Sequence, residues 1–531
     1  MDIGLELDRQ AACRMIIKGL LAGGGLGLHR LKVSAARLYR LNTLPTNVEI
    51  LSYATEDERR QLLHLLQLKP VRSISGVSVI AVMTPPRPCP HGRCAYCPNV
   101  PGVPNSYTGR EPSAMRGLQN AYDPYRQVKS RLNQLKAIGH PISKVELIVQ
   151  GGTFPAVGVD EQRAFMKGCL DAITGKRSDS FEEAVYLAEG SRVRTVGVTF
   201  ETRPDCCGEK EIETMLSLGV TRVELGVQTL NDAVYQLVDR GHTVRDVVEA
   251  TQRLKDAGLK VCYHMMPGLP GSNFKQDLDT FERLFSEADY KPDMLKIYPC
   301  LVLKGTKLYD WWRQGLYRPY KTDEAVELLL EVKSRTPPWV RIMRVQRDIP
   351  APLIIAGVKK SNLRQLVRDR MAERGLRCRC IRCREVGHRL LVDKVEPEQQ
   401  ELKLNTYVYD ASGGREFFIA IEEPEKDILV GYLRLRFPSE EASRPEVSDG
   451  TAGLVRELHV YGREVPVGEA AGGAWQHRGF GAELLSKAES ICAEEGLKKI
   501  LVTSAIGVRR YFRRFGYERE GPYMKKLLSQ A

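Results

Sequence analysis

Three closely spaced cysteines are the residues of this sequence with the clearest capacity for chemistry. Cys89, Cys94 and Cys97 form a C-x4-C-x2-C motif directly after an apolar run at residues 77–84. Three thiolates fill three of the four iron positions of a 4Fe–4S cluster and leave one iron open to another ligand. A structural zinc site would need a fourth ligand nearby, and His91 lies awkwardly inside the tight loop between two cysteines. The spacing favours an iron–sulfur cluster, with zinc and unligated structural cysteines as the alternatives.

Apolar runs alternate with helical patterns between residue 76 and about residue 310, and this alternation predicts a parallel β-sheet. Six such runs indicate a partial (β/α)6, TIM-like barrel, in which function lies at the carboxyl ends of the strands. The runs are residues 77–84, 144–150, 195–200, 222–228, 260–266 and 294–299.

Several glycine or polar residues end these runs, so we expect them to face a bound cofactor. Gly151 and Gly152 follow the second run, where small residues let the backbone approach a ligand closely. Glu201 and Arg203 end the third run, and Gln228 ends the fourth. Each is a candidate for cofactor binding, although each also fits an ordinary position at the mouth of a barrel.

The cysteine motif and the predicted barrel together resemble the radical S-adenosylmethionine enzymes. That resemblance implies a 4Fe–4S cluster on the three cysteines and S-adenosyl-L-methionine at the open iron. Tyr96 stands where those enzymes often carry an aromatic residue. In them a Gly-Gly-Glu sequence after the second strand holds the methionyl amine, whereas this chain has Thr153 as the third residue.

From about residue 400 the pattern changes to antiparallel strands followed by a helix. A glycine loop, Q-x-R-G-x-G-A, opens that helix, and the backbone N–H groups of a helix N-terminus can bind a pyrophosphate. The order of strands, loop, helix, strand and aromatic-rich last helix resembles the GNAT acetyl-coenzyme A fold. The residues of the loop motif are Gln476, Arg478, Gly479, Gly481 and Ala482.

A second cysteine group lies in the basic segment 356–395. Cys378, Cys380, Cys383 and His388 form C-x-C-x2-C-x4-H, and three thiolates with one imidazole can close a tetrahedral zinc shell. The C-x-C spacing is tighter than in most zinc knuckles, so free thiols on a basic linker are the alternative. A bound metal would hold the two neighbouring domains in a fixed relation.

The chain of 531 residues carries a formal net charge of +13 and a sequence pI of about 9.1. This excess of positive charge favours a polyanionic partner such as nucleic acid, although a merely basic surface would give the same composition. Two basic clusters are candidate contacts for nucleic-acid phosphates. They are Arg30, Lys32, Arg37 and Arg40 in the first part of the chain, and Lys359, Lys360 and Arg364 in the linker.

Length and pattern divide the chain into four expected parts. No apolar run of about 18 residues without charge occurs, so we expect no membrane span. The first residues lack the pattern of a secretory signal, and the cysteines show no disulfide-like framework, so we expect a cytoplasmic location. The parts are a basic helical segment (1–75) expected to bind nucleic acid, the barrel (76–355), the linker (356–395) and a GNAT-type α+β domain (396–531).

A radical-type barrel and a GNAT domain on one chain resemble the family of Elongator catalytic subunits, in its single-chain archaeal or bacterial form. The shared stretches include S-Y-T-G-R-E-P-S-A-M-R, F-E-T-R-P-D and R-E-L-H-V-Y-G. The resemblance implies a tRNA wobble-uridine C5 carboxymethyl transferase that uses acetyl-CoA and a 5′-deoxyadenosyl radical. It implies the tRNA anticodon stem-loop and an electron donor as partners, and an oligomer is compatible with it.

The resemblance also implies roles for single residues. Lys144 corresponds to an acetyl-CoA contact in the barrel, and we expect it to act in catalysis. The GNAT pattern has a tyrosine four residues before Gly516, where this chain has Phe512 with Tyr511 beside it. Tyr511 is therefore the candidate acid for the leaving thiolate, and water is the alternative. The implied coenzyme contacts in the GNAT domain are Glu457, Leu458, His459, Val460, Phe480, Gly481 and Ala482, with Tyr511 and Phe512 beside them.

Two other functions stay open on the sequence alone. One is a protein-lysine acetyltransferase with a vestigial radical domain, and the other is a tRNA-binding scaffold without catalysis. Acetylation of histone-like peptides would support the first, and absence of tRNA-stimulated acetyl-CoA hydrolysis would favour the second.

Overall fold

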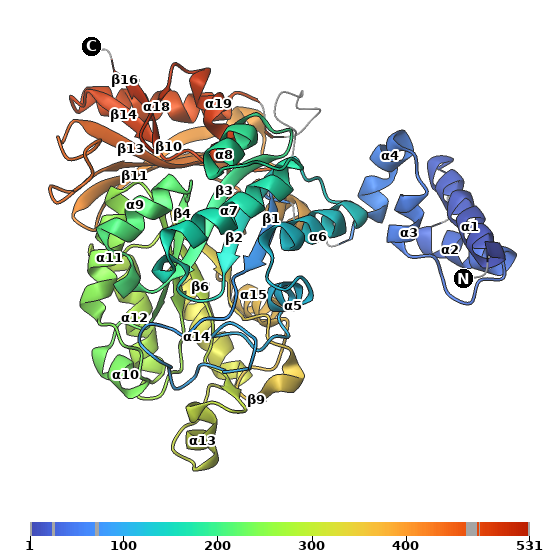
Figure 1. Ribbon diagram of the computed structural model, residues 1–531, viewed down its shortest axis with the longest axis horizontal. Helices are drawn as coiled ribbons and strands as arrows, with labels where there is room; N and C mark the ends of the chain where they lie inside the picture. Colours follow the sequence, from blue (N-terminus) through green and yellow to red (C-terminus); the bar gives the residue numbers. More distant parts are fainter. Residues whose placement is uncertain (1–2, 24–26, 69–73, 463–474, 477, 529–531) are drawn as a thin grey trace.

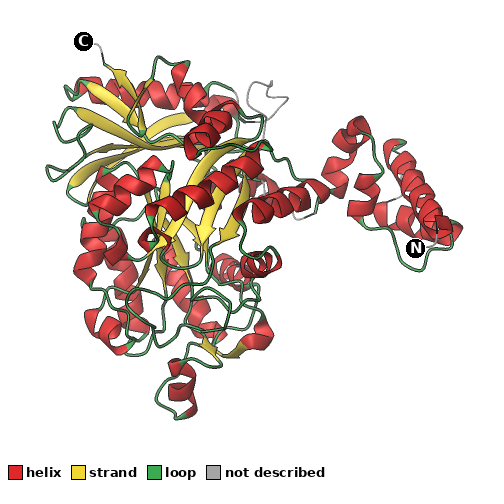
Figure 2. Ribbon diagram, viewed as in Figure 1, coloured by secondary structure: helices red, strands yellow, loops and turns green. Residues whose placement is uncertain are grey.

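A computed structural model describes residues 3–23, 27–68, 74–462, 475–476 and 478–528 of the chain. A helical N-terminal unit stands apart from a larger body, in which a barrel-like α/β domain packs beneath a second, twisted sheet (Figures 1 and 2). This is the mixed α/β architecture that the sequence predicts. Within the described part of the chain, no helix has the length and apolar character needed to cross a membrane.

The N-terminal unit has a core of its own. Two of its helices begin with capping boxes, in which Thr46 and Thr55 accept backbone N–H groups of the first turn. Apolar side chains of all four helices, among them Ile16, Leu31 and Ile50, are buried against one another. The helices are α1 (Ile3–Leu21), α2 (Leu28–Leu38), α3 (Asn47–Ser52) and α4 (Glu56–Leu66).

The barrel domain is built on a seven-stranded parallel sheet of order β1-β2-β3-β4-β5-β6-β8. The six predicted strands are confirmed, and β8 extends the sheet beyond them. The sheet is an open half-barrel, because β1 and β8 each have a neighbour on one side only. The strands are β1 (Ser78–Met83), β2 (Lys144–Gln150), β3 (Arg194–Thr202), β4 (Arg222–Gln228), β5 (Lys260–Met265), β6 (Met294–Ile297) and β8 (Arg341–Arg344).

Most helices of this domain cover the outer face of the sheet and share one buried core with its strands (Figure 1). The helices with Val234 and Leu308 instead pack around the cysteine loop. A short antiparallel pair, β7 (Val302–Leu303) with β9 (Ile354–Ala356), lies outside the main sheet. The helices are α5 (Pro112–Gln119), α6 (Pro124–Ala137), α7 (Val159–Thr174), α8 (Phe181–Gly190), α9 (Glu209–Ser217), α10 (Asp232–Leu237), α11 (Val244–Asp256), α12 (Phe274–Ser286), α13 (Lys307–Arg313) and α14 (Thr322–Ser334).

The linker leads from the barrel to the second sheet and follows the free edge of β8, where the N–H of Ile381 donates to the carbonyl of Val340 at 3.0 Å. Its helices are α15 (Leu363–Glu373), α16 (Ile381–Arg384) and α17 (Val386–His388).

The second sheet has the order β10-β11-β12-β13-β14-β16-β15 and carries α18 on one face. Only β13 and β14 are parallel, and they pair from Ala452/Lys499 to Val455/Val502. Beyond this point β13 continues without β14, so the two strands open like a V. The elements are β10 (Lys403–Ala411), β11 (Gly414–Glu423), β12 (Ile428–Phe437), β13 (Ala452–Val460), α18 (Phe480–Glu494), β14 (Lys499–Val502), α19 (Arg509–Arg513), β15 (Glu518–Glu520) and β16 (Tyr523–Leu527).

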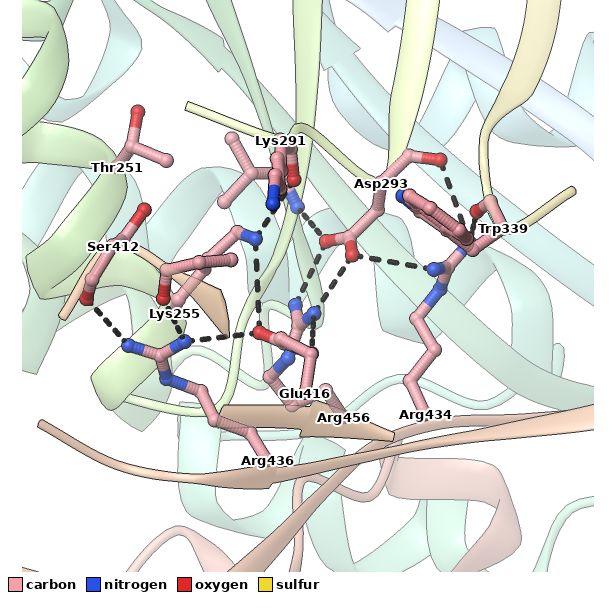
Figure 3. A network of polar contacts seen from close by, with 12 residues as sticks. Thr251, Lys255, Lys291, Asp293, Trp339, Ser412, Glu416, Arg434, Arg436 and Arg456 are labelled. Carbon is pink, nitrogen blue, oxygen red and sulfur yellow. Dashed lines mark hydrogen bonds and ion pairs between the residues drawn. The ribbon is translucent and has the colours of Figure 1, made fainter. Parts of the chain in front are cut away.

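A buried ionic network joins the two domains (Figure 3). Asp293, just before β6, accepts two hydrogen bonds of 2.7 Å from Arg456 of β13. Glu416 of β11 accepts from the same guanidinium at 2.6 Å, and Arg436 of β12 donates to Asp256 of α11 at 2.7 Å. All five side chains are buried, and buried charges are costly unless they are paired. The network therefore favours one orientation of the second sheet on the barrel.

Candidate active site in the barrel cavity

The loop with the first three cysteines follows β1 and lies at the carboxyl ends of the barrel strands. Cys94 and Cys97 are 4% and 6% exposed, and Cys89 is half-buried. The loop is fixed to the barrel, because the N–H of Ala95 donates to the carbonyl of Val238 at 2.9 Å.

The spacing of these thiols suits a cluster better than a single ion. Zn–S bonds of about 2.3 Å place two sulfurs of one tetrahedral zinc site about 3.8 Å apart. Among the described residues, the first three cysteines do not form a group with ligand atoms all within 4.8 Å of one another, whereas the linker cysteines do. The donor set at the end of β1 therefore fits the larger cube of an iron–sulfur cluster.

Each of these three thiols accepts a hydrogen bond. The donors are the backbone N–H of Ser106 at 3.2 Å, the side chain of Asn105 at 3.4 Å and the guanidinium of Arg240 at 3.6 Å. Arg203 lies beside Arg240, because it donates to the Arg240 carbonyl at 2.8 Å and pairs with Asp205 at 2.8 Å. These donors favour negative charge on sulfur, while burial raises the pKa of the Cys97 thiol.

The glycine pair after β2 and the last residue of β4 have unusual backbone conformations. Gly151 and Gly152 have φ angles of 124° and 106°, which favour glycine, and a Cβ on Gly151 would meet the Thr84 hydroxyl at 2.2 Å. Gln228 has a φ of 74°, a strained value for a residue with a side chain. Several buried polar atoms nearby have no hydrogen-bond partner among the described residues, which marks a place for a polar ligand. They belong to Tyr96, Gln150, Thr202, Glu224 and Gln228.

One cavity of about 1140 Å³ connects the cysteine loop with the second sheet. It runs through the interior of the half-barrel and is lined at one end by the three cysteines, and at the other by residues of β13 and of the segment after β14. Twelve arginine and lysine side chains line it against six aspartate and glutamate side chains, so its wall suits an anionic ligand. Of the expected site residues, it is lined by Cys89, Cys94, Cys97, Gly152, Glu201, Arg203, Gln228, Glu457, Leu458, His459 and Phe512.

Glu224 and Lys296, two members of a charged cluster in the middle of this cavity, were missed by the sequence analysis. Glu224 of β4 forms an ion pair with Lys296 of β6, and its carboxylate lies 2.8 Å from Nε2 of His264. Burial raises the pKa of Glu224, but the neighbouring Lys296 and His264 outweigh it and hold that pKa well below its usual range. Beside them, Glu201 accepts a hydrogen bond from the Tyr107 hydroxyl at 2.9 Å. Charged residues inside the otherwise apolar strands were the available signal.

The V-shaped gap between β13 and β14 of the second domain lies at the cavity. Glu457 of β13 accepts a hydrogen bond from Arg434 at 2.9 Å, and the His459 ring lies 3.1 Å from the Ser75 carbonyl. At the start of α18, Gly479 has a φ of 91°, as the loop motif requires. The remaining expected loop residues, Arg478, Phe480, Gly481 and Ala482, lie at this helix N-terminus.

Lys144 and Gln476 meet, although 332 positions separate them. The ammonium group of Lys144, at the beginning of β2, donates to the side-chain oxygen of Gln476 at 2.8 Å. Gln476 in turn donates to the carbonyl of Val460 at 3.1 Å. Three residues expected to bind the coenzyme are therefore in one hydrogen-bonded chain across the domain boundary.

Tyr511 and Phe512 have different surroundings in the structure. Phe512 is 4% exposed and contributes to the cavity wall, whereas Tyr511 is absent from the described lining. The Tyr511 hydroxyl instead lies against Gly481, where an added Cβ would approach it to 2.5 Å. Burial raises the pKa of Tyr511, which keeps its phenol protonated.

The linker cysteines form a compact group. Their three sulfurs lie within 4.8 Å of one another, and the buried Lys333 donates to the sulfur of Cys383 at 3.5 Å. His388 is not brought into this group, because its Nε2 faces Glu385 at 3.3 Å. The sequence motif thus supplies three neighbouring donors, while the expected imidazole lies elsewhere.

The basic residues expected to contact tRNA differ in their surroundings. Lys32 is half-buried and donates to Asn47 at 2.6 Å, and Arg364 donates to the carbonyl of Ile342 at 3.2 Å. The exposed members are Arg30, Arg37, Arg40, Lys359 and Lys360.

Four protein-family models match successive parts of the chain. They are described as the ELP3 N-terminal domain (residues 9–74), the Radical SAM superfamily (83–284), the Radical_SAM C-terminal domain (292–373) and the Acetyltransferase (GNAT) family (385–517). A radical-type barrel followed by a GNAT domain is therefore present on this chain.

Whole-chain similarity extends to named proteins. The chain is 52% identical over 509 residues to the tRNA uridine(34) acetyltransferase of Methanocaldococcus jannaschii, which covers 94% of each chain. It is 43% identical over 526 residues to Elongator complex protein 3 of Homo sapiens, covering 97% of this chain and 96% of the human one. The solved structure of archaeal Methanocaldococcus infernus Elp3 with an N-terminal deletion matches with a TM-score of 0.77 and 48% identity, over 86% of this chain and 100% of that one.

Proposed function

The chain belongs to the family of Elongator complex protein 3 and the tRNA uridine(34) acetyltransferases, and on this basis we propose that it modifies the wobble uridine of tRNA at carbon 5. The proposed product is carboxymethyluridine, with acetyl-CoA as the source of both added carbons. The proposed requirements are S-adenosyl-L-methionine, a 4Fe–4S cluster and an electron donor.

One observation carries this proposal. The same cavity is lined by the three-cysteine loop and by the strands of the GNAT domain, so a radical source and an acyl donor would share one enclosed space. A lysine acetyltransferase has no need for such a connection, because its acyl group passes to a protein surface. The excess of positive charge along the cavity is also suited to the phosphates of a coenzyme and of RNA.

The residues of the barrel would hold the radical source. A 4Fe–4S cluster on Cys89, Cys94 and Cys97 would supply the electron that cleaves S-adenosylmethionine to a 5′-deoxyadenosyl radical. Gly152 and Gln228 would bind this cofactor through backbone and amide groups, since both line the cavity near the cysteine loop. The barrel wall around this site would limit the contact of a reactive species with water.

The GNAT half would bind the thioester. The V after Val455 leaves backbone groups of β13 without a β14 partner, and these would contact the pantetheine arm. The N-terminus of α18 would bind the coenzyme pyrophosphate. Tyr511, whose hydroxyl lies beside Gly481 of α18, would donate a proton to the leaving thiolate when water hydrolyses the thioester. Water is the alternative donor, because Tyr511 is not among the described residues that line the cavity.

An anaerobic reaction tests the proposal. The chain, with its cluster reconstituted, is mixed with tRNA, acetyl-CoA, S-adenosylmethionine and a reductant, and the nucleosides are then analysed by mass spectrometry. Carboxymethyluridine at position 34 supports the proposal. Acetylation of histone-like peptides without any change in tRNA would instead support a protein-lysine acetyltransferase, and tRNA binding without acetyl-CoA hydrolysis would support a scaffold.

Lys144→Ala is expected to raise the KM for acetyl-CoA about tenfold, because a charged hydrogen-bond donor near the coenzyme is lost. Cluster absorbance and RNA affinity should not change, since Lys144 begins β2 at the end of the barrel away from the cysteines. Lys403→Ala is the matched control, because Lys403 begins β10 and is exposed. An unchanged KM in Lys144→Ala would remove this residue from the coenzyme site.

We propose that the linker cysteines bind zinc, with Lys333 stabilising the negative charge of the thiolates. Metal analysis of the anaerobically purified chain should find about one zinc per chain. Cys383→Ser should lose this zinc and keep its iron, since the two cysteine groups are separate. A wild-type chain without zinc would favour free thiols on the linker.

A further inference from the structure

The open side of the half-barrel is lined with arginines. Edge carbonyls of an open sheet need a partner or water. Arg116 of α5 donates to the carbonyl of Ala81 on the free edge of β1 at 3.2 Å, and Arg364 of α15 donates to the carbonyl of Ile342 on β8 at 3.2 Å. Both free edges therefore carry a positive group, and we call the gap between β1 and β8 the seam.

The central cavity reaches this seam. Its lining includes Val79 and Ala81 of β1, Met343 of β8 and Arg131 of α6. Val79, the second residue of β1, is 40% exposed, which is unusual for an apolar residue of a barrel strand. At the amino ends of the strands the seam is closed, because Ser75 donates to Glu385 at 2.9 Å. The cavity is thus open to the side above that contact.

Arg382 is a half-buried cation beside the seam. It lies between the second and third linker cysteines, on α16, which follows the edge of β8. Its guanidinium lines the cavity, and no hydrogen bond or ion pair of this group is found within the described part of the chain. Arg364 and Arg341 lie near it, as does the carboxylate of Glu385. A half-buried guanidinium among other arginines is stabilised by a bound anion.

We propose that the anticodon loop of the RNA lies across the seam between β1 and β8, with one of its backbone phosphates on Arg382 and the next ones near Arg131 and Arg116. This inference rests on the proposed function and names the surface where the RNA enters. A uridine must leave the base stack to reach the cavity, and a lateral opening lets a base enter while the backbone stays outside. The linker cysteines would then hold the loop that presents Arg382.

Arg382→Gln tests this surface against a control from the same loop. Arg379 stands three positions before Arg382 in the same cysteine loop. It is exposed and its guanidinium lies 3.4 Å from Asp427, so Arg379→Gln changes an arginine that faces a carboxylate. A synthetic anticodon stem-loop is titrated against each variant at several salt concentrations. For Arg382→Gln we expect about fivefold weaker binding and a salt slope lower by about 0.7, the value for one phosphate on single-stranded RNA. Arg379→Gln should bind like the wild type, and Arg382→Lys should keep the wild-type slope.

Several outcomes overturn the inference. Equal RNA affinity and slope for Arg382→Gln and wild type would place the RNA elsewhere, and a loss of acetyl-CoA affinity alone would assign Arg382 to a coenzyme phosphate. If the wild type binds no stem-loop, the proposed function fails together with this inference, whereas a failure of the variants alone leaves that function standing. Zinc content and thermal melting verify the fold. Should Arg382→Gln not fold, Arg131→Gln on the opposite side of the seam is tested, and its unchanged RNA affinity would equally overturn the inference.

Discussion

Replacing Cys94 with alanine is expected to abolish uridine modification and to leave tRNA binding intact. Cys94 is 4% exposed and accepts a hydrogen bond from Arg240, so its sulfur points into the site. A 4Fe–4S cluster with one open iron depends on all three thiolates, and loss of one removes the source of the radical. The visible absorbance, the iron content and the release of 5′-deoxyadenosine should therefore fall with the modification. The RNA affinity should not fall, because other residues are expected to contact the phosphates.

Cys169→Ala provides the matched control. Cys169 is fully buried in the middle of α7 and does not line the cavity, so its replacement costs about 1 kcal/mol of stability and leaves the cluster in place. If the Cys94→Ala chain still modifies uridine, the cluster assignment fails. If Cys169→Ala loses the cluster too, the effect of Cys94→Ala reflects general instability.

Asp293→Ala is expected to destabilise the docked state of the two domains by about 3–5 kcal/mol, which is the cost of removing one partner from a buried ion pair. Asp293 binds Arg456 through both oxygens at 2.7 Å and also accepts the N–H of Val261 at 2.8 Å. Without it, Arg456 and Arg434 stay buried with less compensating charge. Urea unfolding, followed by circular dichroism and by limited proteolysis of the linker, measures the change.

The control for this prediction is Glu282→Ala. Glu282 pairs with Arg335 on the surface, with side chains 48% and 44% exposed, and such pairs contribute less than about 1 kcal/mol. A loss of stability in Asp293→Ala no larger than in this control would show that the network does not hold the domains together.

The same carboxylate predicts a pH dependence. Burial raises the pKa of Asp293, but Arg456 and Arg434 outweigh it and hold that pKa well below its usual range. A carboxylate with a depressed pKa stabilises the folded state at pH values above its pKa in the unfolded chain, which is about 3.9. This stabilisation is lost as the pH falls towards the pKa in the folded state. The wild type should therefore lose stability below about pH 4, and Asp293→Ala should show a smaller loss over that range.

Much of this architecture follows from the order of residues along the chain. Alternation of apolar runs with helices predicted six parallel strands, because a strand buried on both faces must be apolar and its crossover needs a helix. The seventh strand was not counted, since β8 has only four residues and two of them are arginines. Spacing also singled out both glycine pairs and both cysteine groups, because tight turns and local sets of donor atoms depend on neighbours in the sequence.

The sequence by itself determined the chemistry that the local motifs can support: three thiols at the end of a strand, a glycine loop at the start of a helix, and a basic chain. Only the tertiary structure decided which of these groups meet. Lys144 reaches Gln476, Glu224 pairs with Lys296, His388 turns to Glu385 instead of the linker cysteines, and Arg382 comes to the open edge of the barrel. Contacts between distant segments depend on how two domains pack and on which buried charges must be paired, and no local spacing encodes that choice.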